Sequence, residues 1–191
     1  MSALPYHFPT MSVDEYLALE KRSDVRHEYD HGYVYAMAGA SVNHMVISNN
    51  MAYSLTGQLD DRPCQPFTEN MRVGLPAQNY YYPDLAVTCG ELAFEKRYDG
   101  DTLLNPIVLF EITSDSTKDY DRTRKLEVYQ RILSLRDYLI VAQDRVHVTH
   151  HTRGKDEWTS RDYTDLTDEI ALASIDCTLP LARVYKKVSW A

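Results

Sequence analysis

Two short apolar runs without a polar interruption predict the centre of a sheet. Residues 107–110 (Ile-Val-Leu-Phe) and 139–142 (Leu-Ile-Val-Ala) carry only apolar side chains, which is typical of strands that are buried on both faces. Between them, the segment 120–133 places Leu126, Tyr129 and Leu133 at helical spacing. A buried strand, a helix and a second buried strand predict a crossover that joins two parallel strands.

Helix-start signals and alternating patterns predict the rest of the fold. Ser12 and Glu15 fit a capping box for a short helix, and Ser41 can cap a longer one. Residues 26–37 predict a hairpin that turns at Asp30-His31-Gly32. The other predicted elements are strands at 65–74, 81–88, 105–113 and 138–143, a more exposed hairpin at 145–152 and 158–164, and a C-terminal helix at 179–187. The pattern indicates an α/β fold, with a mixed sheet, flanking helices and extra antiparallel strands at its ends.

Length and composition favour one domain over residues 1–191, because this length can enclose a single core. No apolar run approaches the roughly 20 residues that span a bilayer, and the first ten residues do not resemble a signal peptide. We therefore expect a cytoplasmic protein. The cysteines, Cys64, Cys89 and Cys177, are odd in number and far apart, so we expect them to be reduced and mostly buried.

The charge of the chain is uneven. The formal net charge is -8, which disfavours nucleic acid as a partner, because phosphate binding usually needs a basic face. Residues 117–136 differ, with six basic and three acidic side chains. The basic ones are Lys118, Arg122, Arg124, Lys125, Arg131 and Arg136. This segment is therefore the candidate surface for a phosphate backbone.

Two acidic residues are the candidates for chemistry. Glu111 follows the apolar run 107–110, and a carboxylate in a buried strand is costly unless it is paired, protonated or bound to metal. Its alternative is a structural ion pair or a strand end that emerges into solvent. Asp84, after Pro83, would alone indicate a turn. Two neighbouring strands could nevertheless bring both carboxylates to one cleft, and carboxylate oxygens are the ligands that Mg²⁺ or Mn²⁺ requires.

These residues also carry a resemblance. Pro83-Asp84 and Glu111-Ile112-Thr113 resemble the signature of the PD-(D/E)XK nucleases. A closer similarity, to the Uma-two family of endonucleases within that class, covers nearly the whole chain. Its stretches are Arg26-His27-Glu28-Tyr29, Met37-Ala38-Gly39-Ala40-Ser41, Tyr82-Pro83-Asp84, Phe110-Glu111-Ile112-Thr113-Ser114, Ser116-Thr117, Tyr120-Asp121-Arg122, Lys125-Leu126-Glu127-Val128-Tyr129, Val141-Ala142-Gln143-Asp144-Arg145, Leu179-Pro180-Leu181 and Val184-Tyr185.

The resemblance implies a restriction-endonuclease-like core and a metal site. Asp84, Glu111 and the Ile112 carbonyl would bind a divalent cation, Mg²⁺ or Mn²⁺. Glu28 matches the family's early glutamate and would add a further carboxylate. From the residues alone, Glu28 is equally a surface residue paired with Arg26 or a neighbour.

The chain departs from the superfamily pattern at one position. Thr113 stands where a lysine is expected, two residues after Glu111. The resemblance makes Lys125, on the following helix, the candidate replacement. Its alternative is a solvated residue that pairs with Asp121 one helical turn away.

Histidines offer a second possible metal site. His147, His150 and His151 lie close together, but no carboxylate or cysteine nearby in the sequence completes the set, so we expect exposed strand residues. His44 lies on the helix that Ser41 begins. It matches a histidine of the resembled family and could approach the cleft.

We therefore expect a metal-dependent endonuclease that hydrolyses phosphodiester bonds in DNA. Asp84 and Glu111 would bind the metal, and Lys125 and Glu28 would complete the catalytic site. The DNA would contact Lys118, Arg122 and Arg124. One alternative is a catalytically inactive nucleic-acid-binding or interaction domain on the same fold, and another is a hydrolase of small phosphate esters. We expect a homodimer, because cleavage of a duplex often needs two sites.

Overall fold

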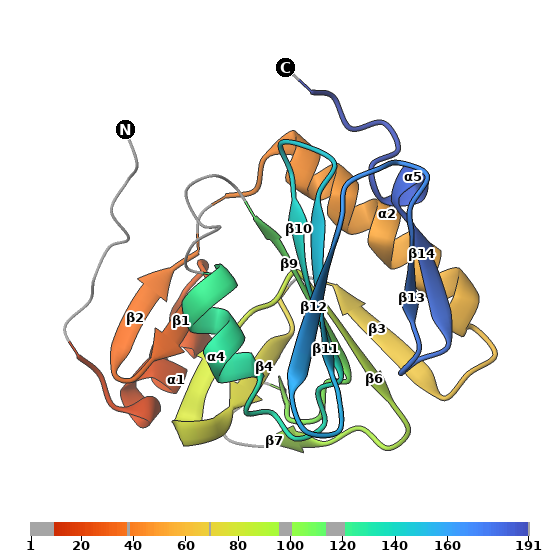
Figure 1. Ribbon diagram of the computed structural model, residues 1–191. Helices are drawn as coiled ribbons and strands as arrows, with labels where there is room; N and C mark the ends of the chain where they lie inside the picture. Colours follow the sequence, from red (N-terminus) through yellow and green to blue (C-terminus); the bar gives the residue numbers. More distant parts are fainter. Residues whose placement is uncertain (1–9, 38, 69, 96–100, 114–120, 191) are drawn as a thin grey trace.

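The central sheet is built around the parallel pair β9 (Val108–Thr113) and β10 (Asp137–Ala142) of the computed structural model (Figure 1). All positions in both strands are buried, which confirms the prediction of two buried parallel strands. The structure describes residues 10–37, 39–68, 70–95, 101–113 and 121–190, with the backbone alone for 121 and 122.

Antiparallel strands extend this sheet on both sides, in the order β12–β11–β10–β9–β6–β3. A second sheet has the order β2–β1–β5–β4–β8–β7. The further bounds in the central sheet are β3 (Cys64–Thr68), β6 (Leu85–Cys89), β11 (Val148–Arg153) and β12 (Trp158–Tyr163). Those in the second sheet are β1 (His27–Asp30), β2 (Tyr33–Ala36), β4 (Arg72–Leu75), β5 (Asn79–Tyr81), β7 (Phe94–Glu95) and β8 (Thr102–Leu103). The predicted mixed sheet is therefore confirmed, with its strands distributed over two sheets.

Helices cover the two faces of the central sheet. Figure 1 shows α2 (Val42–Leu59) along one side, while α4 (Leu126–Tyr129) lies on the other, beside the second sheet. Phe110 belongs to the apolar cluster that contains the buried residues of α2, whereas Leu109 belongs to the cluster that contains Tyr129. Because side chains alternate across a strand, Glu111 is directed to the α4 side.

Local signals are confirmed at the N-terminal elements. α1 (Val13–Arg22) has the predicted capping box between Ser12 and Glu15. β1 and β2 form the predicted hairpin. His31 and Gly32 at its turn have φ of 49° and 92°, as expected for a two-residue hairpin turn.

Four predicted elements differ from the structure. The predicted strand 65–74 is divided into β3 and β4, and the strand 81–88 is divided between β5 and β6, so each contributes to both sheets. The division falls near Asn70, whose φ is 65°, and at Pro83, which has no N–H for a sheet hydrogen bond.

The two later helices are shorter than predicted. A π-helical turn at Asp121–Lys125 precedes α4, and Leu133 is 86% exposed instead of buried. Residue 120 lies outside the described residues. At the C-terminus, Cys177–Pro180 forms β14, which pairs with β13 (Glu169–Leu172), so the helix α5 covers only Leu181–Val184. Pairing with a strand that the sequence did not reveal therefore replaced the first two residues of the predicted helix.

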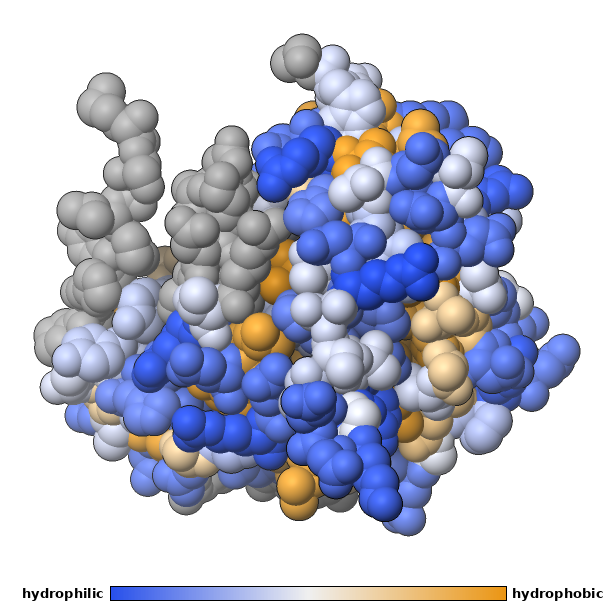
Figure 2. Space-filling model, viewed as in Figure 1, coloured by the Kyte–Doolittle hydropathy of each residue, from blue (hydrophilic) through white to orange (hydrophobic). Residues whose placement is uncertain are grey.

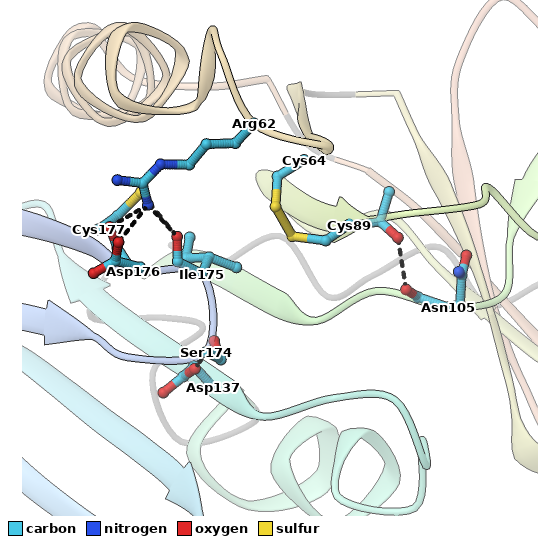
Figure 3. Close-up of a disulfide and its surroundings, with 10 residues drawn as sticks. Arg62, Cys64, Cys89, Asn105, Asp137, Ser174, Ile175, Asp176 and Cys177 are labelled. Carbon is cyan, nitrogen blue, oxygen red and sulfur yellow. Dashed lines mark hydrogen bonds and ion pairs between the residues drawn. A yellow bond between two sulfur atoms is a disulfide. The ribbon is translucent and has the colours of Figure 1, made fainter.

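The cysteine prediction is wrong for two of the three residues. Cys64 in β3 and Cys89 in β6 are register partners and form a disulfide (Figure 3). Cys177 is a buried free thiol, as expected. The bridge joins strands that are distant in sequence but adjacent in the sheet, which explains why cysteine spacing did not reveal it.

Breaking this disulfide is expected to lower the free energy of unfolding by about 3 kcal/mol, because the bond closes a loop between cysteines 25 residues apart. Urea unfolding with and without dithiothreitol measures the change. Cys177→Ser should leave the effect of reductant intact, and the double variant Cys64→Ser/Cys89→Ser should abolish it. An oxidised protein that is no more stable than the reduced one would contradict the expectation.

The surface in Figure 2 is mostly hydrophilic, with small apolar patches. Within the part of the chain that the structure describes, no helix combines the length and the apolar character needed to cross a membrane.

Candidate metal and catalytic site

Asp84 lies at the start of β6 against the neighbouring strand β9. Leu85 pairs with Phe110, and the Asp84 N–H donates to the Phe110 carbonyl at 3.1 Å. The Ile112 N–H in turn donates to Oδ2 of Asp84 at 2.6 Å. Asp84 therefore lies beside the peptide that joins Phe110 to Glu111, so the two predicted metal-binding carboxylates belong to adjacent strands.

Glu111 is 5% exposed, and its Oε1 accepts two hydrogen bonds on the α4 side of the sheet. Lys125 Nζ donates to this oxygen at 3.0 Å, and the Tyr129 hydroxyl donates to the same oxygen at 2.7 Å. Burial raises the pKa of Tyr129 well above its usual value, and the charge of Glu111 raises it further. The Tyr129 hydroxyl thus keeps its proton and remains a donor to Glu111.

Lys125 joins the two sheets. Its Nζ lies 3.0 Å from Oε1 of Glu28 in β1 as well as from Glu111, and 5.7 Å from the centroid of the Tyr81 ring. Glu28 also accepts the Tyr82 N–H at 3.2 Å. Both Lys125 and Glu28 are buried, so the solvated and surface alternatives for these two residues are wrong. Their catalytic roles stay a prediction.

Carboxylates gather in the described part of this group. Glu28, Glu111 and Asp84 contribute them, and Lys125 contributes an ammonium. A buried carboxylate is unfavourable unless a proton, a cationic side chain or a metal cation compensates it. Carboxylate oxygens are also the ligands that hard divalent cations prefer.

The donor chemistry also fits a hard divalent cation. Among the residues whose side chains the structure describes, no three His, Cys, Asp or Glu side chains form a ready-made ligand set. Mg²⁺ is usually held by one or two carboxylates together with waters and substrate phosphates, rather than by a cage of protein ligands. Asp84 and Glu111 offer two carboxylates from adjacent strands, and the Ile112 backbone is hydrogen-bonded to Asp84.

His44 approaches Asp84 from the opposite side of the sheet. It lies in the first turn of α2, whose N-cap Ser41 accepts its N–H at 3.1 Å. His44 Nε2 lies 3.0 Å from Oδ1 of Asp84. The sequence indicated only that His44 could approach the cleft. In the structure, His44 contacts the predicted metal ligand Asp84 directly.

The predicted DNA-contacting residues are only partly described. Lys118 and the side chain of Arg122 lie outside the described residues. Arg124 is described, and its Nε lies 3.1 Å from Oδ2 of Asp30, with 45% of the side chain exposed. The basic surface therefore stays a prediction.

The later histidines depart from the expectation of exposed strand residues. His150 is buried, and its Nε2 lies 2.7 Å from Oδ1 of Asp137. His147 pairs with Asp162 at 3.0 Å, and His151 stacks on Tyr138. Cross-strand pairing supplied carboxylate partners that the local sequence did not contain.

Tyr129 is the site residue that sequence reasoning missed. It was assigned to the apolar side of its helix, and its side chain is indeed fully buried. A buried tyrosine usually needs a partner for its hydroxyl, and this requirement was the available signal. The partner is Glu111.

Comparisons with known proteins define first the class and then the family. A crystal structure from Anabaena variabilis, described as "a putative nuclease belonging to DUF820", matches 94% of this chain and 99% of its own with a TM-score of 0.75. At 16% identity this likeness shows the fold, which is restriction-endonuclease-like. The model of the family Uma2, "Putative restriction endonuclease", matches residues 13–182, and the chain belongs to this family.

Two proteins of Synechocystis sp. are also similar over most of their length. The uncharacterized protein slr1290 is 31% identical over 96% of this chain and 95% of its own length. The uncharacterized protein sll1609 is 29% identical over 78% of this chain and 84% of its own length.

Proposed function

We propose that the protein is a divalent-metal-dependent endonuclease that hydrolyses phosphodiester bonds in DNA. The observation that carries the proposal is the buried group of Glu28, Lys125 and Glu111. Glu111 belongs to β9, and the backbone of this strand also binds the Asp84 carboxylate. Membership of the family and the restriction-endonuclease-like fold support the same activity.

Asp84 and Glu111, with the Ile112 carbonyl, would hold Mg²⁺ or Mn²⁺. Such a cation lowers the pKa of a bound water and neutralises charge on a phosphate. The protein's own contribution is to hold both carboxylates in place. Ile112 fixes Asp84 through its N–H, and Tyr129 fixes Glu111 through its hydroxyl.

Lys125 would supply the cation that the superfamily lysine supplies elsewhere. Thr113 is buried at the end of β9 and carries no charge, whereas the Lys125 ammonium reaches Glu111 from the turn that precedes α4. Negative charge that develops on the phosphate is best stabilised by a group already held in position. Glu28 orients Lys125 for this role by binding the same ammonium.

DNA would contact Lys118, Arg122 and Arg124 through its phosphates, with a steep dependence on salt. Cleavage of both strands needs two sites, so a homodimer is part of the proposal. The proposed location is the cytoplasm, where disulfides such as Cys64–Cys89 are uncommon. A protein with this disulfide reduced would have the lower free energy of unfolding that is predicted above for breaking the bond.

Metal binding is expected to raise the melting temperature, because a ligand that binds only the folded state stabilises it. At a Mn²⁺ concentration about 100 times Kd, the stabilisation is about 2.7 kcal/mol. Differential scanning fluorimetry of the wild type and of Asp84→Ala measures the shift, and Asp84→Ala should lose it. Asp162→Ala, which removes an exposed carboxylate near His147, is the control and should keep it. Equal shifts in wild type and Asp84→Ala would refute the proposed metal site.

A further inference from the structure

Both carboxylate oxygens of Asp84 are contacted by groups from different elements. Oδ2 accepts the Ile112 N–H of β9 at 2.6 Å, and Oδ1 lies 3.0 Å from His44 Nε2 of α2. The Asp84 side chain is 13% exposed and that of His44 is 16% exposed, which places the contact at the rim of the core.

The first turn of α2 is itself fixed to the far end of the central sheet. Ser41 Oγ donates to Gln143 Oε1 at 2.5 Å, directly after β10. Asn43 Nδ2 donates to the carbonyls of Gln143 at 3.3 Å and of Ser189 at 3.0 Å. These contacts hold His44 at a defined distance from the strands, so the helix can set the orientation of Asp84.

We infer that His44 is a positioning residue, which orients Asp84 as a ligand for the divalent cation through the contact between Nε2 and Oδ1. The inference rests on the proposed function. Each carboxylate oxygen has two lone pairs. The Ile112 N–H takes one on Oδ2 and the His44 ring lies against Oδ1, so each oxygen keeps a lone pair with which to bind a cation. Groups that hold a metal ligand in this way typically contribute about 10–100-fold to metal affinity.

Isothermal titration calorimetry with Mn²⁺ tests the inference on the full chain. His44→Ala should weaken the Kd for Mn²⁺ by about 10–100-fold. His44→Gln, whose amide nitrogen reaches a similar distance from the backbone, should restore most of the affinity. The matched control is Asn50→Ala on the same helix, because Asn50 Nδ2 donates to the carbonyls of Val184 at 2.9 Å and Lys186 at 2.8 Å, away from Asp84. Asn50→Ala should lower the melting temperature without changing the Kd.

The outcomes separate the inference from the proposed function. A wild-type protein that binds no Mn²⁺ overturns both. A wild type that binds Mn²⁺ together with a His44→Ala variant of equal affinity overturns only the role of His44. A loss of affinity that is the same in His44→Ala and Asn50→Ala also overturns it, because that pattern indicates general destabilisation. Should His44→Ala not fold, His44→Asn replaces it, since its shorter amide does not reach Asp84; equal affinities of the Asn and Gln variants then overturn the inference.

Discussion

Lys125→Ala is expected to lower the free energy of unfolding by about 3–5 kcal/mol, the range for breaking a buried ion pair by removing one partner. The Lys125 ammonium lies 3.0 Å from both Glu28 and Glu111, and all three residues are buried. Alanine would remove the ammonium that contacts two buried carboxylates. Urea unfolding followed by circular dichroism at neutral pH measures the loss.

The control for Lys125→Ala is a solvent-exposed pair. Arg145 Nη1 lies 2.9 Å from Asp144 Oδ2, with side chains 46% and 39% exposed. Exposed pairs of this kind contribute about 0–1 kcal/mol, so Arg145→Ala should change stability little. If Lys125→Ala and Arg145→Ala lower the free energy of unfolding equally, the contacts of Lys125 with Glu28 and Glu111 do not stabilise the fold as expected.

Glu111→Gln is expected to reduce the rate of DNA cleavage at least about 100-fold. Groups that merely support a metal ligand contribute about 10–100-fold, so removal of the ligand's charge should cost more. Glutamine keeps the volume of the side chain and an oxygen that can accept from Lys125 and Tyr129, and the fold should therefore survive. Single-turnover cleavage of a labelled duplex with Mg²⁺ measures the rate.

Glu127→Gln provides the comparison, because Glu127 is exposed on α4 and lies near Glu111 in sequence but outside the buried group. It should cleave at the wild-type rate. Cleavage by Glu111→Gln at the same rate as Glu127→Gln would remove Glu111 from the catalytic site.

The sequence could predict elements whose signals are local. The capping box of α1 and the hairpin turn at His31-Gly32 depend on neighbouring residues. The buried strands β9 and β10 were predictable because their apolar runs leave no polar face.

Elements that depend on distant partners could not be predicted. β7 and β8 each have two residues, and β8 pairs with β4, whose residues are far away in sequence. The disulfide Cys64–Cys89 likewise depends on the pairing of two strands. The hairpin β13–β14 pairs locally, but the predicted C-terminal helix took the place of its second strand. In the same way, α4 ends early, where the chain forms a turn and Leu133 is left exposed.

The candidate site was predictable in its carboxylates but not in its organisation. Asp84 and Glu111 stand out because each accompanies a strand, and the pairing of β6 with β9 brings them together. Glu28 belongs to the other sheet, so no sequence spacing reveals its contact with Lys125. The contact of His44 with Asp84 depends on how α2 packs on the sheet.

The main alternative, an inactive domain on the same fold, was suggested by Thr113 and by the acidic net charge of -8. The position of Lys125 weakens the first of these arguments, because an ammonium lies 3.0 Å from Glu111 without a lysine at residue 113. The net charge is not addressed by this contact. A direct assay of the activity decides between the two.

Conversion of supercoiled plasmid to nicked or linear DNA tests the central claim most directly. The wild type with Mg²⁺ should convert the plasmid, and EDTA or the substitution Asp84→Asn should stop the conversion. Asp84→Asn keeps the size of the side chain while removing the charge that a cation requires. Plasmid that stays supercoiled with the wild type and either Mg²⁺ or Mn²⁺, or equal conversion by Asp84→Asn, would contradict the assignment of a metal-dependent endonuclease with Asp84 as a ligand.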